Sequence, residues 1–256
     1  MKRWLPPIVI VVVLLGLWQL AASLDVIANA LNIEPFLVPS PSEIAQSLWA
    51  DRSLLLDNGW VTLQEVLAGF ALSVVAGVAF AVVLHLSPML RRAFYPLLVA
   101  SQAIPVVVLA PIFVLAFDYG IGPKLAIVAL ICFFPITVNL LDGLRSVEPD
   151  LLKLMRSMGA SRARTLGSAE LPSALPFLFS GLKVAATVSV IGAVFGEWAG
   201  ADEGLGRLVL LGNNQLQTPR VYAGIVLLTL MAVALFCLVA LAERFACPWN
   251  RNEQAV

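Results

Sequence analysis

The chain has 256 residues, of which 60% are hydrophobic and only 12% are charged, and its mean hydropathy is +0.93. A soluble domain carries about twice that charged fraction, so the lipid bilayer is the expected surrounding of this chain. The formal net charge is zero, which gives no bulk attraction to nucleic acid, and no nucleic-acid partner is expected. Composition therefore predicts an all-α, polytopic membrane protein that forms a single domain over residues 1–256.

Stretches of about 20 apolar residues with few charges predict the membrane spans. The first lies near residues 5–24. The basic start of the chain and the small residues at 20–23 also fit a cleavable signal peptide. A retained first helix is the simpler interpretation, because the run is long enough to span and further spans follow.

An outer loop of mixed polarity is expected at about residues 25–58. Within it, Pro39-Ser40-Pro41-Ser42 precedes an amphipathic stretch at 43–49, and either serine could cap that short helix. The second span, near 60–86, is rich in Gly, Ala and Ser, which allow helices to approach closely in lipid.

The third predicted span, near 94–117, contains Pro96, Pro105 and Pro111. Such a helix must kink and leave carbonyl groups free, which suits a bundle interior or a water-lined path. The remaining spans are expected near 125–144, 176–199 and 221–242. They are joined by a basic segment at 145–175 and a Gly-rich polar segment at 200–220, which makes about six transmembrane helices.

The basic residues predict the orientation of these spans. If the N-terminus is cytoplasmic and the spans alternate, only Arg52, Lys124, Arg207 and Arg220 lie outside. The cytoplasmic segments and the inner end of the fifth span then hold Lys2, Arg3, Arg91, Arg92, Arg145, Lys153, Arg156, Arg162, Arg164, Lys183, Arg244 and Arg251. This excess predicts a multi-pass protein of the cell (inner or plasma) membrane with both termini cytoplasmic.

Residues for catalysis or metal binding are sparse. The sequence has no Gly-Lys dipeptide, and hence no Walker-type phosphate loop. Its one histidine, His85, is expected to be an interfacial residue rather than a ligand. Cys132, Cys237 and Cys247 have neither metal-ligand nor disulfide spacing and are expected to be small buried hydrophobes. No catalytic residue, metal or cofactor is therefore expected.

The basic segment at 147–175 has the pattern of a helical hairpin. Residues 149–158 and 161–170 predict two short amphipathic helices, with Gly159 at positive φ between them and Ser161 as the second cap. Leu152, Met155 and Met158 share one face of the first helix, and flexible apolar side chains of this kind suit a groove on another protein. The alternative is a hairpin that lies on the lipid headgroups and is held there by its arginines.

This segment resembles the cytoplasmic signature of ABC importer permeases, a Glu-Ala-Ala loop with Gly six residues after the Glu. The match rests on Gly159-Ala160-Ser161, on LPSALP at 171–176 and on Gly181-Leu182-Lys183. The resemblance extends from Pro39 to Trp249 and implies a type I importer transmembrane domain with an ATPase bound at this loop. The implied ATPase-coupling residues are Lys153, Leu154, Met155, Met158, Gly159, Ala160 and Ser161. The first three of these stand where the family has Glu-Ala-Ala.

A narrower resemblance rests on the runs SQAIP at 101–105, CFFPI at 132–136, DGLRSV at 142–147 and GAVFGEW at 192–198. These runs are similar to those of the nitrate, sulfonate and taurine permeases. Within that group they are most similar to permeases for the thiamine precursor hydroxymethylpyrimidine. Riboflavin, or nitrate, sulfonate or taurine, is the alternative substrate.

The same resemblance implies the partners. Two copies of the chain would form a channel in the lipid bilayer, with cytoplasmic ATPase subunits on one side. An extracytoplasmic substrate-binding protein would dock on the other side, near residues 200–220. ATP hydrolysis is then expected in a separate subunit, so the chain itself is not expected to be an enzyme.

Polar residues inside predicted spans are costly in lipid and are functional candidates for that reason. Gln102, Pro105, Asn139 and Glu197 are expected to line the translocation path. The alternatives are interhelical hydrogen bonds for Gln102 and Asn139 and a place in the interfacial belt for Glu197. The remaining candidates are Glu65, Asp142 and Lys183, of which the last two are expected either to be solvated at the interface or to form an ion pair with each other.

Two other classes of function fit the sequence less well. A stand-alone ion-coupled secondary transporter would need midplane charges and paired broken helices in two repeats, and the sequence offers few such charges and no evident repeat. A membrane-integral enzyme would need an acid–base or metal cluster, which the residue pattern does not supply.

Overall fold

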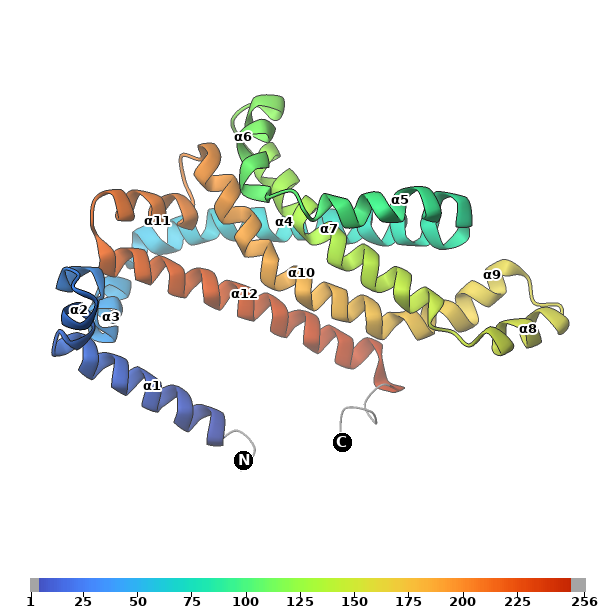
Figure 1. Cartoon of the computed structure of the whole chain (residues 1–256), viewed down its shortest axis with the longest axis horizontal. Helices are drawn as coiled ribbons and strands as arrows, with labels where there is room; N and C mark the ends of the chain where they lie inside the picture. The colour runs from blue at the N-terminus through green and yellow to red at the C-terminus, as the bar shows by residue number, and fades with distance from the viewer. Residues whose placement is uncertain (1–4, 250–256) are drawn as a thin grey trace. The chain divides into compact units, whose positions relative to one another are not determined.

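The computed structural model describes residues 5–249, and this part of the chain is helical with short connections and no strand (Figure 1). Lys2, Arg3 and Arg251, which contribute to the predicted orientation, lie outside the described residues. The helices are α1 Leu5–Ser23, α2 Val26–Leu31, η1 Pro35–Leu37, α3 Pro41–Ala50, α4 Arg52–Leu86, α5 Pro88–Ser101, α6 Val106–Phe117, α7 Ile121–Arg145, α8 Pro149–Ser157, α9 Arg162–Thr165, η2 Leu166–Glu170, α10 Leu171–Gly200, α11 Leu205–Asn214 and α12 Thr218–Ala246.

The all-α, multi-span architecture predicted from the sequence is confirmed. Among the described residues, four helices are long and apolar enough to cross a membrane: α4, α7, α12 and the continuous helix over 162–200. The pair α5 and α6 makes a fifth span if it is counted as one. The predicted first span forms α1, whose described apolar stretch, Val9–Ser23, is shorter than the other four.

The third predicted span is broken rather than kinked. α5 and α6 meet at an angle of 104°. The break comprises residues 102–105, and Pro105 is the N-cap residue of α6. Proline has no backbone N–H and disfavours helical backbone at the residue before it, so the helix ends there. Pro96 and Pro111, by contrast, lie inside α5 and α6.

The fifth span begins earlier than predicted. Arg162–Thr165, the π turn Leu166–Glu170 and α10 form one helix of 39 residues. The π turn lies just before Pro172, which cannot donate a hydrogen bond to the preceding turn, and a wider turn accommodates that gap. The second half of the predicted hairpin is therefore the first part of a membrane-spanning helix and not a separate short helix.

The chain divides into two compact units. The first contains the described residues up to 61 together with 202–229. Ser40 caps α3 in a reciprocal capping box with Glu43, which confirms the predicted cap. An ion pair between Asp51 and Arg220 connects the two segments of this unit. A hydrogen bond from the backbone N–H of Gly204 to the Asn58 side-chain oxygen connects them as well. The helix α11 lies in the 200–220 segment, where the sequence indicated only Gly-rich polar chain.

The second unit contains residues 62–201 and the described residues from 230 onward. Its helices α7 and α10 pack with their backbones nearly in contact. A Cβ at Gly181 would lie 2.6 Å from the Pro135 carbonyl oxygen, and one at Gly196 would lie 3.0 Å from Cα of Lys124. Close approach of this kind is typical of helix pairs in lipid. The adjoining core consists of Ala81, Leu84, Leu98, Leu140, Leu141, Leu144 and Ala174.

Candidate functional site

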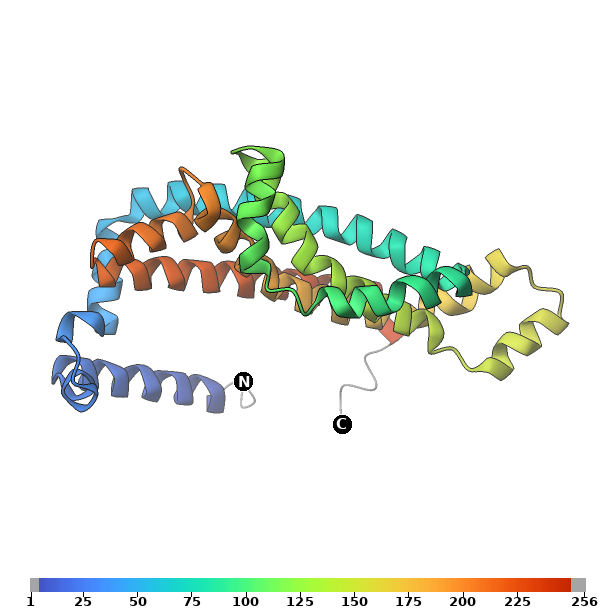
Figure 2. The ribbon, with the colours of Figure 1, turned by 45° about the horizontal axis from the view of Figure 1, so that its top comes forward.

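The predicted coupling segment forms a helix–turn–helix at one end of the second unit, beyond the end of α7 (Figures 1 and 2). Gly159 has φ +79°, and the N–H of Ala160 donates back to the Met155 carbonyl at 2.9 Å. The Ser161 hydroxyl accepts from the N–H of Arg164 at 3.3 Å. Both the positive φ and the cap were predicted. A Cβ at Gly159 would meet nothing within 4 Å, so only the backbone conformation requires glycine there.

The exposed apolar face of α8 and its C-terminal turn consists of Leu151, Leu154 and Met158, which are 44%, 56% and 78% exposed. Their spacing places them on one side of the helix. Met155 and Leu152 are half-buried instead, so Met158 shares its face with Leu154 and not with those two residues. An apolar face that is left open at the end of a helix is typical of a surface that binds another protein.

A buried carboxylate anchors this segment to the end of α4. The side chain of Glu170 is 2% exposed, and its Oε1 accepts from Nη1 of Arg162 at 2.5 Å. Its Oε2 lies 2.8 Å from Nε2 of His85, and Nη2 of Arg162 lies 2.7 Å from the same imidazole nitrogen. The solvated side chain expected of an interfacial residue is wrong for His85, because its side chain is 7% exposed and its Nε2 contacts both Glu170 and Arg162.

Glu170 was not singled out from the sequence. Its signal was weak, since it lies among polar residues of a basic segment, where a solvated carboxylate is the ordinary expectation. The only available hint was its spacing of eight residues from Arg162, which is two helical turns and places both on one face.

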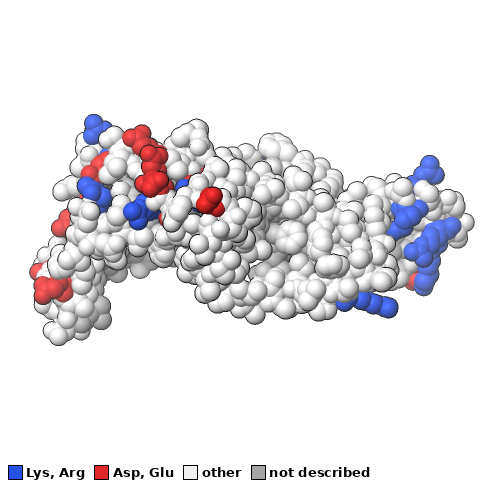
Figure 3. Space-filling view, turned by 90° about the horizontal axis from the view of Figure 1, so that it is seen from above, with Lys and Arg blue, Asp and Glu red and all other residues white. Residues whose placement is uncertain are grey.

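Basic side chains gather at the end of the second unit that carries α8 and α9 (Figure 3). Lys153 lies on this surface and pairs with Asp150 at 2.9 Å, with both side chains at least three-quarters exposed. A pair this exposed contributes little stability. Gly159 and Ser161 are exposed and Ala160 is half-buried, so the segment presents basic, apolar and small residues together.

The residues predicted to line a path lie in three different places. Gln102 and Pro105 occupy the break between α5 and α6, and both are exposed. The side-chain amide of Asn139 donates to the Pro135 carbonyl at 2.7 Å, a bond within α7 rather than between helices. Glu197 is fully buried in α10 and accepts from the Thr62 hydroxyl at 2.6 Å. The structure therefore brings only Gln102 and Pro105 close together.

The expected ion pair between Asp142 and Lys183 is wrong. Nζ of Lys183 binds Oε2 of Glu243 in α12 at 2.9 Å, and Asp142 is exposed, as the alternative of interfacial solvation predicts for it. The cysteines are free thiols. Cys132 and Cys247 are buried as expected, whereas Cys237 is exposed.

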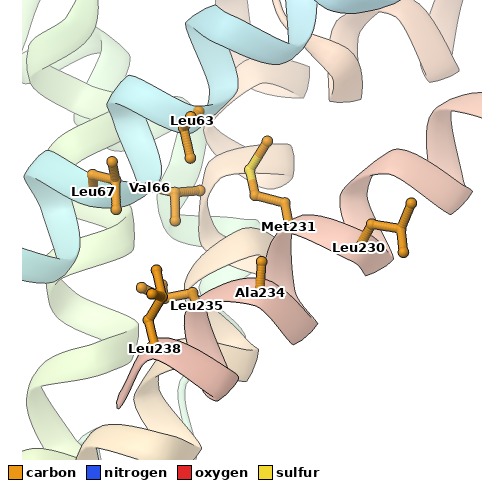
Figure 4. Close-up of a pocket in the computed structure, with 8 residues that line it drawn as sticks. All are labelled: Leu63, Val66, Leu67, Leu230, Met231, Ala234, Leu235 and Leu238. Carbon is orange, nitrogen blue, oxygen red and sulfur yellow. The ribbon is translucent and has the colours of Figure 1, made fainter. Parts of the chain in front are cut away.

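Two hollows lie within the separate units. A cavity of about 470 Å³ in the second unit lies between α4 and α12 and is lined only by apolar side chains (Figure 4). It has no polar group to orient a polar solute. A cavity of about 360 Å³ in the first unit is lined by Asp57, Asn58, Asp202, Glu203 and Arg207 with three leucines. No group of His, Cys, Asp and Glu that could hold a metal occurs within residues 5–249.

These features define a class: a polytopic, all-helical membrane subunit with an exposed helix–turn segment between two of its spans. Residues 70–245 match the family described as the binding-protein-dependent transport system inner membrane component. The chain belongs to this family, and it is the permease subunit of an ABC importer, a multi-pass protein of the inner membrane. Membership implies an ATPase as a separate subunit and a substrate-binding protein as partners.

Similar proteins cover nearly the whole chain. The formylaminopyrimidine transport permease protein ThiX of Halalkalibacterium halodurans is 37% identical over 97% of both chains. The riboflavin transport system permease protein RibX of Chloroflexus aurantiacus is 33% identical over 95% of this chain and 90% of its own. In fold, the chain resembles the inward-facing MetNI methionine ABC transporter, with a TM-score of 0.68 and 19% identity over 77% of this chain and 98% of that chain.

Proposed function

We propose that two copies of this chain form the membrane pathway of an importer for a thiamine-precursor pyrimidine, with both termini cytoplasmic and an ATPase bound at residues 147–165. The observation that carries the proposal is the exposed face of Leu151, Leu154 and Met158. Burying this face on the ATPase would remove large apolar side chains from water, at about 25 cal/mol for each Å² of apolar surface.

The anchoring of the segment explains how it transmits force. Arg162 is held through Glu170 to His85 at the end of α4, and Arg162–Thr165 is continuous with α10. A displacement of α8 by the ATPase would therefore move two spans and not only a flexible loop. Lys153, Leu154 and Met155 replace the Glu-Ala-Ala of the family at this surface, so the contact is apolar and basic instead of acidic.

The break at residues 102–105 supports a homodimer with a path beside it. Non-helical backbone at membrane depth is tolerated where it is buried in protein or lines a water-filled cavity. Gln102 and Pro105 are exposed in the single chain. A second copy would cover one side of this break with protein, and an aqueous path between the two copies would lie on its other side. The Gln102 amide would then be available to the solute.

The cavity lined by Asp57, Asp202 and Glu203 is the proposed docking place of the binding protein. It includes the start of the 200–220 segment, and Gly204 is fixed there through Asn58. The cavity is lined by three carboxyl groups and one guanidinium group, that of Arg207, so a binding protein with basic residues on its docking face fits.

The substrate proposal rests on relatedness to the formylaminopyrimidine permease, and riboflavin is the second candidate because of the 33% identical relative. Calorimetry with the cognate binding protein would decide between them. Binding of an aminopyrimidine and not of riboflavin supports the proposal, whereas binding of taurine, a sulfonate or nitrate alone contradicts it.

The coupling role is tested at Gly159. Proline requires φ near −65° and cannot adopt the +79° found there, so Gly159→Pro should abolish uptake while membrane insertion persists. Asparagine tolerates positive φ, so Gly159→Asn is the matched control and should retain most uptake. Normal uptake by the proline variant would exclude this turn as the coupling element.

A further inference from the structure

His85, in the last turn of α4, lies between two groups that make opposite demands on one of its nitrogen atoms. Its Nε2 lies 2.8 Å from Oε2 of Glu170 and 2.7 Å from Nη2 of Arg162. A carboxylate oxygen only accepts hydrogen bonds, whereas a guanidinium nitrogen only donates them. One imidazole nitrogen therefore cannot serve both partners at once: with a proton it donates to Glu170, and without a proton it accepts from Arg162.

The surroundings of His85 leave the choice to these two partners. Its side chain is 7% exposed, and its Nδ1 is buried without a hydrogen-bond partner. The end of α4 packs against α5, α7 and the start of α10. The following charged residues of these helices form no hydrogen bond or ion pair with His85: Arg91 and Arg92 of α5, Asp142 and Arg145 of α7, and Lys183 of α10. The protonation of Nε2 is therefore decided between Glu170 and Arg162.

We propose that His85 is a positioning residue of the transport cycle, whose Nε2 proton selects which residue connects α4 to the helix over 162–200. Without this proton, Arg162 donates to Nε2 and connects the first residue of that helix directly to α4. With it, Nε2 donates to Glu170, and Arg162 keeps only its bond to the other oxygen of that carboxylate. The inference rests on the proposed binding of the ATPase at residues 147–165, because Arg162 belongs to that segment.

Acid should separate Arg162 from α4. Histidine side chains change charge between about pH 5 and 8, and a charged imidazole carries a proton on both nitrogens. Acidification therefore places a proton on Nε2, which can then no longer accept from Arg162. The Arg162 side chain is 45% exposed, so water can receive its released N–H groups. We expect the coupling of substrate binding to ATP hydrolysis to be weaker at the acidic end of this range.

Solid-state NMR of the permease–ATPase complex in lipid bilayers tests the proton itself. His85 is the only histidine of the chain, so ¹⁵N-histidine in the permease alone gives the ring signals of this residue. Nε2 should have the chemical shift of an unprotonated acceptor nitrogen at about pH 8 and of a protonated nitrogen at about pH 5. The same state of Nε2 at both ends of this range would overturn the proposal, wherever the ATPase binds.

The effect on coupling is measured as the ratio of substrate-stimulated to basal ATP hydrolysis. His85→Gln keeps a donor and an acceptor but does not titrate. From about pH 8 to about pH 5 the wild-type ratio should fall about threefold more than that of His85→Gln, which is the effect of one hydrogen bond. The comparison removes the titration of the other subunits, because they are the same in both complexes.

A second variant tests the role of the guanidinium group. Arg162→Lys should also lose the additional pH dependence, because one ammonium nitrogen cannot replace two guanidinium nitrogens that contact different residues. Arg164→Lys is the matched control, since Arg164 lies in the same helix α9 and is exposed, and it should follow the wild type. A wild-type pH profile in His85→Gln or in Arg162→Lys would overturn the proposal.

The outcome at Gly159 separates this inference from the proposed function. If Gly159→Pro abolishes uptake but His85→Gln follows the wild-type profile, the coupling function stands and this inference alone fails. If Gly159→Pro transports normally, the proposed coupling function fails, and a change of the Nε2 signal with pH would then have no link to transport.

Discussion

The Glu170 carboxylate accepts a hydrogen bond from the Arg162 guanidinium at 2.5 Å, at the start of the helix that follows the turn at Gly159. The same carboxylate reaches His85 at the end of α4. A buried group therefore joins α4 to the helix that continues into α10, next to the segment where the ATPase is proposed to act.

Removal of the Glu170 carboxylate should weaken the attachment of residues 147–165, the proposed ATPase-binding segment, to α4. Glu170→Ala would leave the Arg162 guanidinium and His85 facing each other without an anion, at a cost of about 1–3 kcal/mol. We expect a lower melting temperature and a loss of substrate-stimulated ATP hydrolysis, with the basal rate retained. Thermal unfolding and ATPase assays on the reconstituted complex measure both.

Asp150→Ala is the control for stability, because it removes a carboxylate from a largely solvated pair on α8. It should change the melting temperature by an amount equivalent to less than about 0.5 kcal/mol. If Glu170→Ala and Asp150→Ala changed the melting temperature equally, the contact of Glu170 with α4 would not contribute to stability.

The close approach of α7 and α10 should not tolerate a larger residue at Gly181. The first carbon of any side chain would lie 2.6 Å from the Pro135 carbonyl oxygen, so Gly181→Val must push the helices apart. Overpacking of this kind costs about 1–3 kcal/mol. Gly16→Ala in α1 meets nothing within 4 Å and should leave the melting temperature unchanged or slightly raised. A Gly181→Val variant with the wild-type melting temperature would contradict this packing.

The ion pair of the first unit should make its stability pH-dependent. The hydrogen bond from Arg220, followed by its positive charge, lowers the pKa of Asp51, although burial partly opposes the shift. A lowered folded-state pKa stabilises the fold above the ordinary aspartate pKa, and this contribution is lost as pH falls through the lowered value.

Asp51→Asn should abolish that acid-sensitive component, which we expect to be about 1 kcal/mol or less because both side chains are partly exposed. Melting temperatures recorded over the acidic range should converge for the wild type and the variant at the lowest pH. A constant difference between them at every pH would contradict the assignment to Asp51.

Local signals in the sequence predicted the turn at Gly159 and the cap at Ser161 well. Gly159 and Ser161 act through their own backbone and nearest neighbours, so residue type alone is informative there. The same holds for the Ser40 cap of α3. The spans were predictable because every residue in a lipid-exposed helix contributes to the same apolar signal.

Pairings between helices were not predictable from the same information. Lys124 was expected in an outer turn, but it is buried against Glu65 from a helix about 60 residues away in sequence. Lys183 binds Glu243 for the same reason, since the helix packing and not the span boundaries decides which charges meet. The break at Pro105 was expected as a kink, because the number of prolines does not indicate how far a helix bends.

The central claim is that the exposed face of α8 binds the ATPase. A photo-crosslinking amino acid at position 158, compared with one at the half-buried position 152, tests it in membranes that contain the whole complex. The account predicts an efficient crosslink from position 158 to the ATPase, and little from position 152. Crosslinks from position 158 to lipid alone, with none to the ATPase, would show that the segment lies on the membrane surface and would contradict the account.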